Sequence, residues 1–448
     1  MATDVEVKPE KKATGKLRWI VVGLVALATV INYIDRQTIT VLWPQHMAPD
    51  LFPDMDADGH KQILGLVSAV FILAYAAGQA IFGKIFDWIG TRLGFVLSIG
   101  AWSIATALHA FAQGVLSLSI FRAILGVSEA GNWPGATKAN AEWFPTKERA
   151  FAQGIFNSGA AIGGIISIPL LAYLALFLHW KIIFLAVAAL GAIWLIPWLI
   201  IVKAPPQYHS WITPEERDYI LSGQVNEDME GDGVRDGGYN PSTGELLTRR
   251  QSWGVITASA VIDPIWWLFI VWIPTYLFEV HGFSIKELAG AGWIPYVGAM
   301  FGAWFGGLLA QYLLSKDWTV NATRKLTITL GCLIMLPCLL LMSIASTAVA
   351  AIILMFLILF GFQTAIGNVQ TLPSDFLGGN TVGTLSGIAG MAAKLTGFVL
   401  TLLVPILTAG ANYAPVFILG SALALTAIAA IWFLCGTIEP LKPKSTNA

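Results

Sequence analysis

Charged side chains stand inside long apolar segments of this sequence. Asp35 and Arg36 are neighbours in one such segment, and Arg122 and Glu129 lie together in a later one. A charge at the centre of a membrane-spanning helix costs about 2.5 to 3.5 kcal/mol on insertion scales, so each needs a partner or a hydrated cavity. These residues are therefore the first candidates for chemistry.

The spacing of the second group places its members on one helix face. Arg122 and Glu129 are seven residues apart, which is two helical turns, with Gly126 between them. Asn132 and Trp133 continue the same stripe. Asp35 and Arg36 are instead about 100° apart, so that one can face a central cavity while the other reaches a neighbouring helix. A local pair that only neutralises itself is the alternative interpretation of these two neighbours.

The chemistry of the side chains divides their roles. Arginine keeps its proton, whereas carboxylates can lose or gain theirs. We therefore expect Arg36 to anchor an anionic group, and Asp35 and Glu129 to carry protons. Arg122 is expected to pair with Asp35 or Glu129 in one protonation state and to be released in the other. A static salt bridge is the alternative for Arg122.

Lys394 supplies a cation in the second half of the chain. It could receive a carboxylate or hydroxyl groups across the centre of the protein. The alternative is that its ammonium group extends to the membrane interface, as many lysines in membrane helices do.

The segments that carry these residues are numerous and long. Hydrophobic residues make up 56% of the chain and charged residues 12%, against about 25% charged residues in soluble domains. A helix needs roughly 20 apolar residues to cross a bilayer. Twelve runs of that size predict an all-α membrane protein, and they lie near residues 17–43, 62–86, 93–113, 115–138, 149–176, 181–203, 253–278, 288–314, 325–345, 347–369, 381–408 and 411–435.

The basic residues orient these segments, because cytoplasmic loops retain Lys and Arg. With both ends of the chain inside, 20 of the 26 basic residues are cytoplasmic. Three fall outside (Lys61, Lys181 and Lys286) and three lie within segments (Arg36, Arg122 and Lys394). We therefore expect both termini to be cytoplasmic.

One long polar stretch divides the segments into six and six. The expected organisation is a tail at 1–16, a six-helix bundle at 17–203, a cytoplasmic linker at 204–252, a second bundle at 253–435 and a tail at 436–448. The Gly-rich and acidic stretch at 226–240 is expected to be disordered. Thr213 before Pro214, with Glu216 three residues on, predicts a short surface helix in the linker.

Several motifs resemble a known family. Residues 83–92 read GKIFDWIGTR, which resembles the loop signature of the major facilitator superfamily. The stretches NYIDR at 32–36, RAILGVSE at 122–129 and EWFP at 142–145 look like the anion:cation symporter family within it. DPIWW at 263–267 is similar to the hexuronate transporter branch. Nearly the whole chain takes part, apart from the linker and the tails.

The resemblance implies a major facilitator fold, with a substrate site between two six-helix halves. It implies a bacterial inner-membrane symporter that imports hexuronates, such as glucuronate and galacturonate, with protons and without a bound cofactor or metal. A monomer is expected. Ala160 and Phe362 depart from the pattern of related transporters, so another organic anion, such as galactonate or glucarate, is the alternative substrate.

A sugar acid would also need neutral polar groups and an aromatic platform. Trp133 could provide the platform, and packing is the competing role for such an aromatic. The neutral candidates are Asn32, Tyr33, Tyr75, Asn157, Gln363, Asn368 and Ser386. The loop residues Gly83, Asp87, Gly90 and Arg92 are expected to act at a gate, by capping helix ends and pairing across the two halves, and not to bind substrate.

Other classes of function fit the sequence poorly. A net charge of -1 does not favour nucleic-acid binding. The six histidines are scattered singly and the three cysteines lie in apolar runs, so neither an enzyme site nor a metal site is predicted. A channel would explain the helices but not the charged residues concentrated in one half.

Overall fold

The computed structural model describes residues 15–231, 241–377 and 381–442, and within them the chain is helical without strands. The first half begins with α1 and a π-helical turn, η1, and ends with α7. Its elements are α1 (Leu17–Leu42), η1 (Trp43–Met47), α2 (Ala48–Leu51), α3 (Ala57–His109), α4 (Val115–Glu129), α5 (Asn132–Trp143), α6 (Thr146–Ala175) and α7 (Trp180–Ile201).

The linker and the second half follow. The linker holds η2 (Pro206–Tyr208), α8 (Pro214–Gly231) and α9 (Thr243–Leu247). The second half comprises α10 (Arg250–His281), α11 (Ile285–Ala291), α12 (Ile294–Ser315), α13 (Val320–Met342), α14 (Ala348–Phe376), α15 (Thr381–Leu407), η3 (Ala409–Ala411), α16 (Ala414–Ala429) and η4 (Ala430–Leu434).

Two breaks in helices explain how the long helices of this structure correspond to twelve membrane spans. Within the described residues, ten helices are long and apolar enough to cross a membrane. One of them, α3, covers two spans, because Gly90 has φ 76° and breaks the helical path; glycine adopts this left-handed region without steric cost. The short helices α4 and α5 together form one interrupted span. The expected all-α fold of twelve spans in two halves is confirmed.

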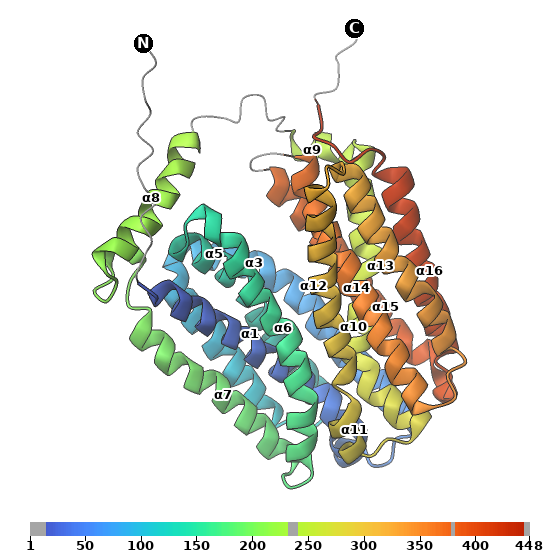
Figure 1. The fold of residues 1–448 in the computed structure, drawn as a ribbon. Coiled ribbons are helices and arrows are strands. Elements are labelled where there is room, and N and C mark those ends of the chain that lie inside the picture. Colours follow the sequence, from blue (N-terminus) through green and yellow to red (C-terminus); the bar gives the residue numbers. More distant parts are fainter. Residues whose placement is uncertain (1–14, 232–240, 378–380, 443–448) are drawn as a thin grey trace, which may run out of the picture.

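The two halves stand side by side (Figure 1). The linker helices α8 and α9 lie at one end of the bundle, which we call the linker end, and α11 lies at the opposite, distal end. Contacts between the halves run mainly from α3 to α15, from α6 to α11 and α12, and from α1 to α10.

Polar contacts between the halves gather at the distal end. Lys61 of α3 is buried there, and its Nζ donates to the carbonyl oxygen of Thr408 at 2.7 Å and pairs with Glu279 at 3.2 Å. Its own-helix neighbour Asp58 pairs with it at 2.9 Å. Asp58 also accepts the backbone N–H of Gly410 at 3.1 Å. We call this group the Lys61 lock.

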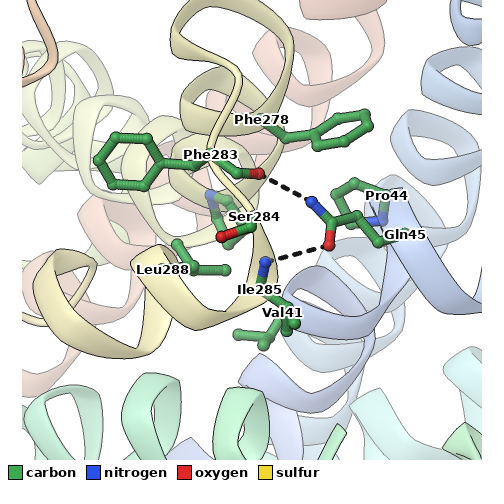
Figure 2. A pocket seen from close by; sticks show the side chains of 9 residues that line it. Val41, Pro44, Gln45, Phe278, Phe283, Ser284, Ile285 and Leu288 are labelled. Carbon is green, nitrogen blue, oxygen red and sulfur yellow. Dashed lines mark hydrogen bonds between the residues drawn. The ribbon is translucent and has the colours of Figure 1, made fainter. Parts of the chain in front are cut away.

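A second distal contact uses Gln45 of η1. Its amide nitrogen donates to the carbonyl oxygen of Phe283 at 2.7 Å, and its amide oxygen accepts the N–H of Ile285 at 3.1 Å. Figure 2 shows both bonds in a small pocket lined by residues of η1, α10 and α11. One glutamine side chain thus provides hydrogen-bond partners for one carbonyl group and one N–H group of the turn that leads into α11.

The predicted linker helix is present. It begins at Pro214, and the hydroxyl of Thr213 accepts the backbone N–H of Glu216 at 3.2 Å. Glu216 in turn pairs with Arg18 at 2.9 Å and accepts the backbone N–H groups of Leu17 and Arg18. A linker carboxylate therefore caps α1, as expected at the positive end of a helix dipole.

The segment expected to be disordered is described only in part. Helix α8 continues as far as Gly231, and residues 232–240 lie outside the described residues. Disorder of those residues stays a prediction.

Candidate functional site

A buried ion pair joins α1 to α4 at the centre of the first half. Arg36 donates from Nη2 and Nε to one carboxylate oxygen of Glu129, at 3.1 and 3.3 Å. The same Nη2 donates to the side-chain oxygen of Asn32 at 3.1 Å. Arg36 is 3% exposed and Glu129 is not exposed at all, so each depends on the other for charge balance.

Four aromatic rings surround the guanidinium group of Arg36. Its central carbon lies 4.9 Å from the ring centre of Tyr33, 5.1 Å from Tyr75, 5.5 Å from Phe71 and 5.4 Å from Trp267. Rings within about 6 Å attract a cation through their electron-rich faces. Trp267 belongs to α10, so this cage crosses from one half to the other.

Arg122 forms no ion pair among the described residues, which corresponds to the released one of the two states expected for it. Its guanidinium carbon lies 4.4 Å from the ring centre of Phe71, and its Nε and Nη1 have no hydrogen-bond partner among the described residues. Glu129 pairs with Arg36 instead. Asp35 is fully buried and neither of its carboxylate oxygens has a partner among those residues. In this conformation, the Arg122 pair predicted with Asp35 or Glu129 is therefore not formed.

Close helix packing explains how Glu129 reaches Arg36. A Cβ atom on Gly126 would lie 2.5 Å from the carbonyl oxygen of Phe71 and 3.1 Å from the backbone nitrogen of Tyr75. Only glycine lets α4 approach α3 this closely. The predicted stripe of Arg122, Gly126 and Glu129 therefore combines a contact residue with two charged groups.

A second ion pair lies in the other half, and only its lysine is predicted as a site residue from the sequence. Lys394 of α15 donates to Asp263 of α10 at 2.8 Å, and the indole N–H of Trp267 donates to the same carboxylate oxygen at 2.9 Å. Lys394 also lies 5.5 Å from the ring centre of Trp267. Asp263 could have been found as the carboxylate inside a predicted span that balances Lys394.

Trp267 is where the two pairs meet. Its ring is within 5.5 Å of one cation from each half, Arg36 and Lys394. Tyr33 belongs to the same group, since its ring centre lies 4.9 Å from the guanidinium carbon of Arg36. The arrangement therefore places two cations, each held by a carboxylate, around one aromatic ring at the interface between the halves. We define the central charged site as Arg36, Glu129, Lys394, Asp263, Trp267 and Tyr33, together with Asp35 and Arg122.

Other predicted substrate residues lie elsewhere in this conformation. Asn368 accepts a hydrogen bond from Arg324 at 2.9 Å, beside the Arg324–Asp375 ion pair. Its amide nitrogen donates to the Thr364 carbonyl at 3.2 Å. Asn368 is thus engaged inside the second half and not in the central charged site.

The four remaining substrate candidates lie on α5, α6, α14 and α15. Asn157 is exposed and accepts a hydrogen bond from Gln153 at 3.1 Å. Trp133 packs edge-on against Phe156 with ring centres 4.8 Å apart. Ser386 is exposed and Gln363 is half-buried.

The gate motif is folded within the first half. Asp87 pairs with Lys138 at 3.1 Å, and Lys138 also donates to the Phe86 carbonyl at 2.7 Å. Gly83 precedes the break at Gly90, and Arg92 follows it, with its carbonyl accepting the indole N–H of Trp198 at 3.1 Å. Pairing of these residues across the halves stays a prediction.

The pocket of Figure 2 is separate from the central charged site. The pocket lies at the distal end, beyond Val41, more than one helical turn from Arg36. Among the described residues, no group of three or more His, Cys, Asp or Glu side chains could hold a metal ion. The three cysteines are buried and unpaired.

Comparison with known proteins agrees with this architecture. Residues 25–401 match the family model of the Major Facilitator Superfamily. The chain aligns along its length with a solved D-xylose-proton symporter, covering 93% of this chain and 97% of that one, with a TM-score of 0.69 at 15% identity. The chain therefore belongs to the major facilitator superfamily and is a multi-pass membrane protein.

Within that superfamily, the resemblance to hexuronate carriers is confirmed. The chain is 33% identical to the hexuronate transporter of Escherichia coli K12, over 93% of both chains. It is 34% identical to the galacturonate transporter of Dickeya chrysanthemi, over 71% of this chain and 89% of that protein.

Proposed function

We propose that this protein is a proton-coupled symporter, not an enzyme, that imports hexuronates such as glucuronate and galacturonate by alternating access. The observation that carries the proposal is a pair of cations, the buried Arg36 and the half-buried Lys394, that both contact Trp267 between the two halves. Relatives that are named hexuronate and galacturonate transporters support the substrate class.

The Arg36–Glu129 pair supplies a physical basis for coupling. A buried arginine needs a counter-anion, and Glu129 holds that place here at 3.1 Å. Protonation of Glu129 removes its charge, and the carboxylate of a sugar acid then takes its place at Arg36. Proton and substrate thus bind together, because either one alone leaves a buried charge without compensation.

The neutral and aromatic groups complete the proposed substrate site. Tyr33, Tyr75 and Asn32 lie around Arg36 and could bind hydroxyl groups. Trp267 offers an aromatic face beside both cations, and Trp133 stays a predicted platform. Asp35, with both oxygens unpartnered among the described residues, is the second proposed proton carrier.

The orientation follows from the distribution of positive charge. The linker end and both termini are proposed to face the cytoplasm, with the helices in the inner membrane of a bacterial cell, because cytoplasmic loops retain Lys and Arg. The Lys61 lock and Gln45 then join the halves on the outer side. These contacts close the outer side of the carrier, which we propose acts as a monomer.

Uptake into proteoliposomes tests the proposal. Purified protein should accumulate labelled glucuronate when the lumen is made alkaline relative to the outside, and a protonophore should abolish the accumulation. Unlabelled galacturonate should compete, whereas glucose should not. Accumulation that ignores the pH gradient would refute proton coupling. Stronger competition by galactonate or glucarate than by either hexuronate would favour the alternative substrates.

A further inference from the structure

We infer that Asp263 is a fixed counter-charge that tunes the central charged site to substrates with one negative charge and against those with two. The inference deepens the proposed function, since it assumes that organic anions bind at this site. Asp263 and Lys394 are 131 residues apart in the sequence, and folding brings them into contact.

The position of Asp263 is held by two donors. One of its carboxylate oxygens accepts from Lys394 at 2.8 Å and from the indole of Trp267 at 2.9 Å. Charge-assisted bonds of this length are strong. The same indole ring contacts Arg36, so Asp263 acts on the surroundings of both cations.

The charges of the central charged site balance. Three cations face three carboxylates, each counted at its ordinary charge: Arg36, Arg122 and Lys394 against Asp35, Glu129 and Asp263. Buried charges are costly unless they are compensated. A monoanion that enters with one proton leaves this balance unchanged, whereas a dianion with one proton adds one uncompensated negative charge.

Access distinguishes the two pairs. The side chains of Lys394 and Asp263 are 17% and 12% exposed, whereas those of Arg36 and Glu129 are 4% and 0% exposed. A second carboxylate on a substrate that is bound at Arg36 would therefore meet the more open pair. With Asp263 in place, it meets a lysine that is already neutralised and a carboxylate that repels it.

The inference predicts a change of selectivity, not only a loss of activity. In Asp263→Asn, Lys394 has no counter-charge and the site gains one net positive charge. The ratio of galactarate binding, a dianion, to glucuronate binding, a monoanion, should rise about tenfold or more, since unit charges in a partly buried site interact strongly over several ångströms. Competition of both ligands against labelled glucuronate on the purified carrier measures the ratio.

Two further variants keep the test decisive. Asp263→Asn combined with Lys394→Gln restores the charge balance without the ion pair and should return the ratio to near the wild-type value. Lys394→Gln alone should lower the ratio below wild type, which tests the same idea if the Asp263→Asn protein does not fold. Asp375→Asn is the matched control, because it removes one carboxylate from the ion pair with Arg324, which lies outside the site, and should leave the ratio unchanged.

The outcomes separate the two proposals. A wild-type carrier that binds glucuronate, together with folded Asp263→Asn and Lys394→Gln variants at the wild-type ratio, would overturn the counter-charge role alone. A ratio that rises equally in Asp375→Asn would overturn it as well, because the effect would not be local. A wild-type protein that binds neither anion would refute the proposed function, and the inference with it.

Discussion

At the scale of single residues, Arg36 is the group on which the proposed cycle depends. It pairs with Glu129, donates a hydrogen bond to the side-chain oxygen of Asn32 and is enclosed by four aromatic rings. The two hydrogen bonds to Glu129 leave from different nitrogens of its planar group. A lysine would offer the same charge without that geometry.

Arg36→Lys should therefore weaken glucuronate binding strongly while the protein stays folded. Loss of one charge-assisted hydrogen bond, worth about 1.5 to 3 kcal/mol, corresponds to roughly a tenfold to hundredfold weaker affinity. Binding to the purified variant is the measurement. Arg324→Lys, at the ion pair with Asp375 outside the site, is the control and should retain affinity. Wild-type affinity of the Arg36→Lys carrier would contradict the anchor role.

Glu129→Gln should separate exchange from accumulation. The variant imitates the protonated side chain with nearly the same shape and has no charge to cycle. Exchange of labelled glucuronate across liposomes preloaded with substrate should persist, whereas accumulation driven by a pH gradient should be lost. Glu287→Gln, at an exposed capping box in α11, should keep both activities. If Glu129→Gln still concentrates substrate with normal pH dependence, Asp35 becomes the proton carrier to test.

At the scale of elements, the contact between α3 and α4 positions both charged residues of α4. These helices share one of the most extensive interfaces in the protein. Gly126 faces the backbone of α3 between Phe71 and Tyr75. Any side chain at this position separates the helices and moves Glu129 away from Arg36.

Gly126→Ala should destabilise the fold and weaken substrate binding together. Overpacking of this kind costs about 1 to 3 kcal/mol, which should appear as a lower melting temperature of the purified protein. Gly100→Ala is the matched control, since no atom lies within 4 Å of a Cβ there, and it should melt at or above the wild-type temperature. A Gly126→Ala protein with unchanged melting and binding would show that the close approach is not needed.

At the scale of the whole molecule, the halves are joined at the distal end by a buried lysine. Lys61 is 2% exposed and contacts Glu279 and Thr408 of the second half. Tyr413 donates to Glu279 at 2.9 Å and adds a second support. Opening this end requires that these bonds be exchanged for water, so they favour the present conformation over one open at the distal end.

Lys61→Met should shift the population toward a distal-open state. Spin labels can be attached at the exposed distal positions Asp54 and Lys286 in a background without the native cysteines. Pulsed electron paramagnetic resonance then measures the distance between the labels, one in each half. A longer-distance component should grow in the variant. Lys181→Met, which removes a distal lysine that lies over Trp180 within the first half, should leave the distances unchanged. Identical distance distributions in the Lys61→Met and wild-type proteins would exclude a locking role.

Much of the fold follows from local features of the sequence. The length and apolarity of each segment predict a spanning helix, because the bilayer thickness sets that length. The charged residues Asp35, Arg36, Arg122, Glu129 and Lys394 were recognised as candidates for the same reason. The helix at Pro214 was recognisable from its cap alone.

The partners of these charges were decided only by the tertiary structure. Arg36 and Glu129 are 93 residues apart and Asp263 and Lys394 are 131 residues apart. Which carboxylate meets which cation depends on the rotation and tilt of whole helices, and packing against neighbours sets both. A helical repeat places Arg122 and Glu129 on one face, but only the approach of α4 to α3 at Gly126 and of α1 to α4 makes Arg36, and not Arg122, the partner of Glu129.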